Sequence, residues 1–330
     1  MEARTPVDAP RGPLLNVKGL KTYFHLFGGT VKALDGIDLQ VREQETVGVV
    51  GESGGGKSVM AFSILRLIDS PGKIEAGEIF FRGEDLLTKS EAEMRRVRGR
   101  DIAMVFQDPM TALNPLHTVH DQIDEMLCLH TDLGGKERRE KILSLLREVG
   151  IPDPEERLRA YPHQFSGGML QRVVIATALA ARPRLIIADE PTTALDVTVQ
   201  AQILRLMEEM VKRHRAALIL ITHDLAVVAN LTQRVAVMYC GRIVEEGPTE
   251  EVVRSPLHPY TRGLLHSIPS LNQKRVKGKR LPQIPGAAPS LPPLGCAFAP
   301  RCPVAFGLCA EVPQTRPAEN GRLVACHLEV

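Results

Sequence analysis

Residues 51–58 read Gly-Glu-Ser-Gly-Gly-Gly-Lys-Ser and match the phosphate-binding pattern G-x-x-x-x-G-K-[ST]. A strand-like apolar run at 46–50 precedes them and a helix-like run at 59–68 follows, which is the context that the pattern needs. Such glycines allow positive φ angles, so that successive N–H groups can cradle phosphates at a helix N-terminus. The alternative is a glycine-rich turn. The expected nucleotide contacts are Gly51, Ser53, Gly54, Gly55, Gly56, Lys57, Ser58 and Val59.

Two acidic residues supply what a phosphate loop needs for hydrolysis. Lys57 is expected to reach the β- and γ-phosphates, and the Ser58 hydroxyl to ligate Mg²⁺. The apolar run at 185–188 ends in Asp189, which suits a carboxylate that holds Mg²⁺ through water. Glu190 follows and is placed to polarise an attacking water. A solvated turn is the alternative, but the presence of the loop favours catalysis.

The composition is that of an ordinary globular protein. The 330 residues allow about two domains, and 44% of them are hydrophobic and 24% charged. The formal net charge of +2 gives no support for a nucleic-acid partner. The sequence contains no apolar run of about 18 residues that could span a bilayer, and residues 1–13 lack the apolar core of a secretory signal. We therefore expect the protein to stay in the cytoplasm.

The order of elements predicts an α/β fold. Short apolar bursts separated by turn residues at 14–50 predict antiparallel strands that lead into the phosphate loop. Helical periodicity at 119–149 predicts a helical insertion. The strand–loop–helix order that follows predicts a parallel, doubly wound sheet with ligands at the carboxyl ends of its strands. Beyond about 255, proline-rich and basic stretches predict a linker before a compact cysteine segment.

Two aromatic residues ahead of the loop, Tyr23 and Phe24, end a predicted strand. An aromatic ring at this place could stack on the adenine of a nucleotide. Either ring could equally fill the core of the antiparallel sheet, and the sequence leaves the two possibilities open.

Several motifs together resemble the ATP-binding-cassette (ABC) ATPases in order and spacing. They are the phosphate loop, Gln107, the signature Phe165-Ser166-Gly167-Gly168-Met169-Leu170-Gln171-Arg172, residues 185–190, Ala194-Leu195-Asp196 and His223. The Ser-Gly-Gly signature distinguishes this family from other phosphate-loop ATPases, which lack it. The resemblance implies an ABC-type core with an antiparallel β subdomain and a helical subdomain, plus a small Cys-rich C-terminal extension. The implied divisions are a tail at 1–13, an ATPase domain at 14–255 with its helical part at about 110–170, and a C-terminal domain at 256–330.

The resemblance also implies that two cassettes pair head to tail. Ser166, Gly167 and Gly168 of one cassette would then meet the γ-phosphate bound by the other, at a helix N-terminus. Asp196 would shape the seam between them. Leu170 departs from the family pattern, in which Arg is frequent, and this departure could alter a contact across the dimer.

Two further roles follow from the resemblance. Gln107 would contact Mg²⁺ and water while its loop touches a membrane subunit. His223 would hold the γ-phosphate. Gly55 stands where many relatives have Ser, which should be tolerated because backbone N–H groups bind the phosphates.

A narrower resemblance points to the ATPases of dipeptide and oligopeptide importers. It rests on residues 51–54, 107–115, 191–200 and His258-Pro259-Tyr260-Thr261, and on the cysteine tail with Pro300-Arg301-Cys302-Pro303 and Ala325-Cys326-His327. It implies two transmembrane permease subunits, a second ABC ATPase subunit that we expect to be a paralogue, and a periplasmic or extracellular substrate-binding protein. It also implies a peripheral location on the cytoplasmic face of the inner membrane.

Four of the six cysteines lie in the last 35 residues, at Cys296, Cys302, Cys309 and Cys326. Their gaps of 5, 6 and 16 residues are not those of a zinc ribbon, and thiolates suit either zinc or an iron–sulfur cluster. The family resemblance favours a [4Fe–4S] cluster, with zinc next and unmetallated core cysteines as the plain alternative. Cys128 and Cys240 are expected to be apolar fillers.

Other functions remain open at this point. An importer ATPase of the same subfamily could serve nickel chelates, and a soluble ABC ATPase could act on nucleic acid or ribosomes. The single cassette and the lack of a long coiled-coil insertion favour the peptide importer.

Overall fold

A small antiparallel sheet forms the first layer of the computed structural model, which describes residues 12–193, 195–267, 283–287, 289 and 294–329. Its strand order is β2-β1-β4-β5. Alternate residues of β1 and β2 are buried, as expected for strands with one face on a core. The strands are β1 (Leu15–Leu26), β2 (Gly29–Val41), β4 (Gly72–Phe81) and β5 (Glu84–Asp85).

The main sheet has eight strands in the order β11-β12-β10-β9-β3-β8-β7-β6. The run from β9 to β6 is parallel, and the strands on the other side pair antiparallel. Two strands of the C-terminal part thus extend the sheet that carries the phosphate loop. The bounds are β3 (Thr46–Val50), β6 (Ile102–Val105), β7 (Leu185–Asp189), β8 (Ala217–Thr222), β9 (Arg234–Tyr239), β10 (Arg242–Pro248), β11 (Arg316–Ala318) and β12 (Arg322–Val324).

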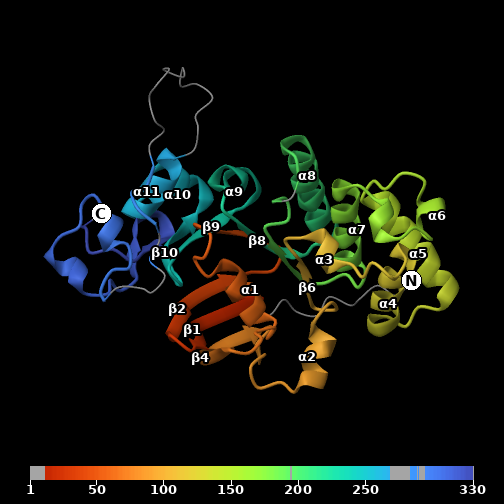
Figure 1. The fold of residues 1–330 in the computed structure, drawn as a ribbon, viewed down its shortest axis with the longest axis horizontal. Helices are drawn as coiled ribbons and strands as arrows, with labels where there is room; N and C mark the ends of the chain where they lie inside the picture. Colours follow the sequence, from red (N-terminus) through yellow and green to blue (C-terminus); the bar gives the residue numbers. More distant parts are fainter. Residues whose placement is uncertain (1–11, 194, 268–282, 288, 290–293, 330) are drawn as a thin grey trace.

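Helices cover the main sheet and build the helical part at the right of Figure 1. Thr118 caps α4 and Ser90 caps α2, each with a reciprocal capping box. The α-helices are α1 (Lys57–Ile64), α2 (Glu91–Val97), α3 (Pro109–Ala112), α4 (Val119–His130), α5 (Gly135–Glu148), α6 (Pro154–Arg157), α7 (Gly167–Leu179), α8 (Val197–His214), α9 (Leu225–Leu231), α10 (Thr249–Arg254) and α11 (Pro259–His266). Short 3₁₀ turns are η1 (Pro162–Gln164), η2 (Ala299–Arg301), η3 (Gly307–Ala310) and η4 (Glu319–Gly321).

The main sheet is buried on both faces, which explains its continuous apolar strands. On β7, Ile187 belongs to the core shared with the antiparallel sheet and α1, whereas Ile186 belongs to the core shared with the helical part. Ile219 and Leu218 divide in the same way on β8. The alternation fixes the register of the sheet, because a slip of one residue would exchange the two faces.

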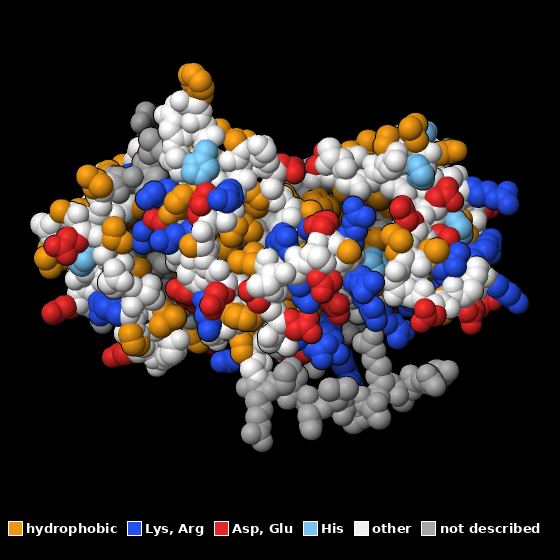
Figure 2. Space-filling model, turned by 90° about the horizontal axis from the view of Figure 1, so that it is seen from below, with side chains coloured by type: hydrophobic (Ala, Val, Ile, Leu, Met, Phe, Trp, Pro, Cys, Tyr) orange, Lys and Arg blue, Asp and Glu red, His pale blue; other side chains and the backbone are white. Residues whose placement is uncertain are grey.

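The predicted α/β fold with an antiparallel sheet and a helical part is confirmed. Residues 1–11 of the predicted tail and the basic run at 274–280 lie outside the described residues. Of the helices that the structure describes, not one combines the length and apolarity needed to cross a membrane. On the face seen in Figure 2, basic and acidic side chains are interspersed.

Candidate functional site

The phosphate loop lies between β3 and α1 and borders a solvent-open cavity of about 240 Å³. Gly56 shows why the pattern needs glycine. Its φ angle is +98°, and a Cβ there would stand 2.4 Å from the Ala33 carbonyl oxygen. Apart from Gly51, the predicted contacts of this segment all line the cavity: Ser53, Gly54, Gly55, Gly56, Lys57, Ser58 and Val59, together with Gln107 and Glu190.

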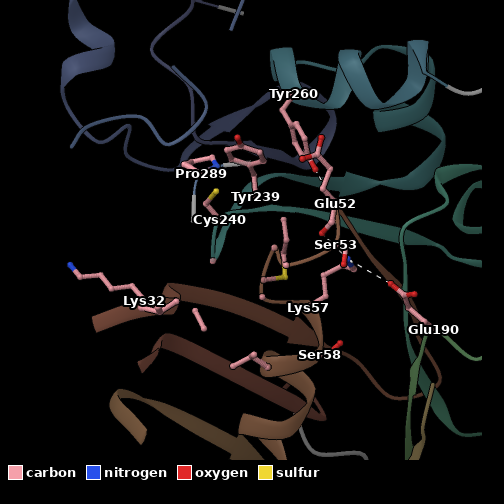
Figure 3. A pocket seen from close by; sticks show the side chains of 18 of the residues that line it. Lys32, Glu52, Ser53, Lys57, Ser58, Glu190, Tyr239, Cys240, Tyr260 and Pro289 are labelled. Atoms are coloured by element: carbon pink, nitrogen blue, oxygen red, sulfur yellow. Dashed lines mark hydrogen bonds and ion pairs between the residues drawn. The ribbon is translucent and has the colours of Figure 1, made fainter. Parts of the chain in front are cut away.

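Lys57 lies under the loop with its side chain only 4% exposed. Its ammonium donates to the carbonyl oxygens of Gly51 at 2.9 Å and Glu52 at 3.0 Å. The nearer Glu190 carboxylate oxygen is 3.9 Å away (Figure 3). Burial lowers the pKa of Lys57, and the surrounding carboxylates oppose that shift. The ammonium therefore stands at the bottom of the cradle, where a phosphate would meet it.

Ser58 and Asp189 meet across 131 residues of sequence, because β3 and β7 both pair with β8 in parallel. The Ser58 hydroxyl donates to Asp189 Oδ1 at 3.1 Å. Burial raises the pKa of Asp189, while the Ser58 hydrogen bond and the Lys57 charge act in the opposite direction. A hydroxyl beside a carboxylate is a donor set of oxygen atoms that fits Mg²⁺.

Glu190 follows β7 in the left-handed region, with φ at 43°. Its Oε2 accepts from the Thr193 hydroxyl at 2.9 Å and from the Gln107 amide at 3.4 Å, and lies 3.4 Å from His223 Nδ1. The side chain is 14% exposed, so a solvent path reaches it. A carboxylate held in this way beside a phosphate cradle can accept a proton from water.

The signature residues lie away from this cavity. Ser166 caps α7 by accepting the Met169 N–H at 3.4 Å, and Asp196 caps α8 by accepting the Val199 N–H at 3.0 Å. Both caps are exposed, as is Gly167. Gly168 is the close-packing glycine, since a Cβ there would stand 2.7 Å from Val199 Cγ1. Within one chain these residues do not join the phosphate cradle.

Comparisons with known proteins identify the family. Residues 34–193 match the ABC transporter model, and residues 244–309 match the C-terminal region of oligopeptide/dipeptide transporters. A probable peptide ABC transporter ATP-binding protein of Sinorhizobium fredii is 51% identical over 95% of this chain and 94% of that protein. The dipeptide transport ATP-binding protein DppD of Escherichia coli is 48% identical over 95% and 96%.

The chain belongs to the ABC transporter ATP-binding proteins. A solved dimer of an ATP-binding cassette in a post-hydrolysis state, bound to ADP and Pi, is similar with a TM-score of 0.64 and 28% identity. The structural match covers 71% of this chain and 98% of the solved chain. An ATPase of this family uses ATP and Mg²⁺.

The position of Tyr23 and Phe24 ahead of the loop left open whether either ring stacks on adenine or fills the sheet core, and neither lines the cavity in the described part of the chain. The Tyr23 hydroxyl donates to Asp35 at 2.8 Å, and burial with this bond raises the pKa of Tyr23 to about 12. The Phe24 ring lies against Gly72. On this side the cavity is lined by Lys32 and its neighbours.

Sequence reasoning missed the C-terminal side of the ABC site. Glu52, Tyr239, Tyr260 and Pro289 line the cavity opposite the antiparallel sheet (Figure 3). Glu52 occupies a variable position of the loop pattern, and the others are separated from it by nearly 190 residues or more, so local patterns carry no signal for their meeting. Glu52 and Tyr260 each belong to a stretch that carries the family resemblance, but neither stretch indicates that the two residues meet.

The cysteine prediction requires correction. In the described residues, which include Cys296, Cys302, Cys309 and Cys326, His, Cys, Asp and Glu side chains form no group of three or more that could hold a metal ion. Neither the iron–sulfur cluster nor zinc is supported, and all four thiols are free. Burial raises the pKa of Cys296 and of Cys302.

Backbone and aromatic contacts hold the segment against the rest of the chain. The Cys296 N–H donates to the Cys309 carbonyl at 2.9 Å, and Phe298 is buried against Tyr239 and Tyr260. Of the other two cysteines, Cys240 packs against a hydrophobic core as expected and also lines the cavity. Cys128 differs from expectation, because it is exposed on α4.

Proposed function

We propose that this chain is the ATP-hydrolysing subunit of an importer that takes up di- or oligopeptides across the inner membrane. The observation that carries the proposal is the position of the Glu190 carboxylate, 3.9 Å from the Lys57 ammonium in the phosphate cradle. The substrate class is supported by relatives named as peptide or dipeptide transport ATP-binding proteins, which match almost the whole chain.

The proposed mechanism assigns each step to a side chain of the site. Lys57 and the loop N–H groups bind the β- and γ-phosphates of ATP. Ser58, Asp189 and Gln107 would hold Mg²⁺, which neutralises charge on the phosphates when bound. Glu190 orients the attacking water and accepts its proton. His223, 58% exposed and within 3.4 Å of Glu190, contacts the γ-phosphate.

We further propose that two cassettes complete each other's sites, the second one being a paralogue. Ser166 and Asp196 are exposed helix caps outside the cavity of their own chain, which leaves them free to meet a partner. Ser166 with Gly167 and Gly168 would offer hydrogen bonds to the γ-phosphate from the N-terminus of α7. ATP would then act as the link that closes the dimer.

The membrane partners proposed are two permease subunits, served by a periplasmic or extracellular substrate-binding protein. Two apolar side chains beyond Gln107 support a contact there, because Met110 is 52% and Leu116 83% exposed. Contact through this loop would hold the chain peripherally on the cytoplasmic face. It would also connect Gln107 in the ATP site to the permease.

We propose that the chain divides into an ATPase domain and a C-terminal domain near residue 255. Residues 14–255 would carry the ATP site, with the helical part at about 110–170 contacting the permease. Residues 256–330 would form the C-terminal domain. The pairing of β12 with β10 argues that this last part is built onto the ATPase sheet, not tethered beside it.

The test uses the chain co-purified with its permease subunits in proteoliposomes, with peptide-loaded binding protein outside. Glu190→Gln should bind ATP but hydrolyse it at least ~10²-fold more slowly, the usual loss for a general base, and stop peptide uptake. Glu208→Gln is the matched control, since that residue forms an exposed ion pair on α8. Wild-type hydrolysis by Glu190→Gln would refute the catalytic assignment. Hydrolysis without peptide uptake in the wild type would refute the importer assignment.

A further inference from the structure

Two residues from the C-terminal part of the chain, Arg301 and Tyr260, bind Glu52 of the phosphate loop. Arg301 forms a two-pronged ion pair with it, with Nη1 2.7 Å from Oε2 and Nη2 3.0 Å from Oε1. The Glu52 backbone N–H donates to the Tyr260 hydroxyl at 2.8 Å. Three contacts therefore fix both the side chain and the backbone of a residue inside the phosphate loop.

Arg301 is itself held firmly. Its side chain is 7% exposed, and it donates to the carbonyl oxygens of Pro285 at 2.8 Å and Gly286 at 3.1 Å. Its Nη1 also lies 3.3 Å from the Tyr239 hydroxyl. The hydrogen bonds to Glu52 raise the pKa of Arg301, so the group stays charged. A planar fork with this many fixed donors positions a carboxylate far better than a flexible ammonium would.

Tyr260 is equally immobile, because it is fully buried in an aromatic cluster. Its ring centroid lies 4.6 Å from that of Tyr239 and 5.4 Å from that of Phe298. The last of these rings comes from the C-terminal segment just before η2. The cluster thus joins α11, β9 and the C-terminal segment behind the loop, and Figure 3 shows Tyr239 and Tyr260 beside Glu52.

The contacts that Arg301 and Tyr260 make with Glu52 also affect the neighbouring Lys57, which is expected to bind phosphate. The Glu52 carbonyl oxygen accepts from Lys57 at 3.0 Å, so the position of Glu52 sets that of the ammonium. The Glu52 carboxylate also borders the cavity, where an unpaired negative charge would repel a polyphosphate. Arg301 occupies both carboxylate oxygens, and so it removes that repulsion while it holds the loop in shape.

We propose that Arg301 and Tyr260 are positioning residues for ATP, through which the C-terminal part of the chain sets the affinity of the phosphate loop. This proposal rests on ATP binding at the loop, as proposed above. Coupling between two sites is reciprocal. If the contact of Arg301 with Glu52 strengthens ATP binding, then bound ATP must strengthen the docking of the C-terminal segment on the loop. The extension is therefore a nucleotide-sensing element of the ATPase.

The experiment measures ATP affinity, hydrolysis and limited proteolysis of the complex with its permease subunits. Arg301→Gln should weaken ATP binding roughly tenfold, within the usual range for coupled sites, and raise KM more than it lowers kcat. Adding Glu52→Gln to that variant removes the unpaired charge, and should restore only the part of the affinity that charge repulsion had removed. ATP should slow cleavage of the C-terminal segment in the wild type and not in Arg301→Gln.

Two further variants separate positioning from loosened structure. Arg316→Gln is the matched control, because Arg316 bonds the Cys326 and Leu328 carbonyls within the same segment and does not contact the loop. It should bind ATP like the wild type. Tyr260→Phe removes only the hydroxyl that accepts the Glu52 N–H. This variant still tests the proposal if Arg301→Gln does not fold. It should weaken ATP binding several-fold, within the same range of coupling.

The proposal is overturned if both Arg301→Gln and Tyr260→Phe bind ATP with wild-type affinity. It is also overturned if Arg316→Gln loses as much affinity as Arg301→Gln, or if adding Glu52→Gln restores wild-type affinity, because charge repulsion alone would then explain the loss. Failure of the wild-type chain to bind ATP would overturn the proposed function as well. Unchanged affinity in the variants would overturn this inference alone.

Discussion

The buried imidazole of His258 should make the protein lose stability in mild acid. His258 is the N-cap of α11, where its Nδ1 accepts the Tyr260 N–H at 3.0 Å. Burial, with a smaller effect from the Arg262 charge, lowers the pKa of His258 from 6.5 to about 4. The nearby Glu245 carboxylate is occupied by the backbone N–H of His258. A proton on Nδ1 would abolish the cap and place a positive charge at a helix N-terminus, where the dipole opposes it.

The pKa values give the direction and size of the effect. The folded state has the lower pKa, so the unfolded state binds more protons between these values. The contribution of His258 to the free energy of unfolding is therefore fully present above pH 6.5 and is lost as the pH falls towards 4. At 1.36 kcal/mol per pH unit, the complete loss is about 3 kcal/mol. Between about pH 7 and about pH 5 the loss should be about 2 kcal/mol.

Urea unfolding, followed by far-ultraviolet circular dichroism because the chain has no Trp, measures this loss. His258→Asn keeps a side-chain acceptor for the cap but does not titrate, so its stability should fall less than that of the wild type over the same pH range. His266→Asn, exposed at the other end of α11, is the control and should follow the wild type. Equal acid losses in His258→Asn and the wild type would refute the reasoning.

Three further changes test the site. Lys57→Ala should weaken ATP binding by about 1.5–3 kcal/mol, because a charged hydrogen bond to phosphate is lost, and calorimetry that finds wild-type affinity would contradict that role. Ser166→Arg should leave the monomer able to bind nucleotide but block ATP-dependent dimerisation on size exclusion, since a bulky cation would enter the partner's γ-phosphate pocket; undiminished dimers would exclude completion in trans. Gly56→Ala should destabilise the fold by about 1–2 kcal/mol, because it strains a left-handed residue and brings Cβ 2.4 Å from the Ala33 oxygen, and a wild-type melting temperature would refute this.

The fold could be predicted because each of its main elements carries a local signature. The continuous apolar run of β7 is typical of a strand covered on both faces, and the periodic apolar faces of α4 and α5 predicted a helical part. The extension of the sheet by β11 and β12 could not be predicted in this way. Those strands have three residues each, and Pro317 lies in the first, so no alternation marks them.

The cysteine segment shows a different limit. Clustering in sequence suggested a metal, because metals often hold together segments too short to bury a core. The segment instead docks on existing structure, with Phe298 and Arg301 buried against β9 and the phosphate loop. Spacing alone does not reveal such docking, since the surface that receives the segment comes from elsewhere in the chain.

The two sides of the cavity at the phosphate loop differ in how far the sequence predicts them. Gln107, Glu190 and His223 each follow a strand closely, and their strands β6, β7 and β8 are consecutive neighbours beside β3. Parallel strands bring their carboxyl ends to one edge, so topology alone gathers these residues around the phosphate loop. Arg301 reaches Glu52 over 249 residues through side-chain contacts that no strand order dictates. The side proposed to be catalytic can thus be inferred from motifs in order, whereas the contact of Arg301 with Glu52 becomes visible only in three dimensions.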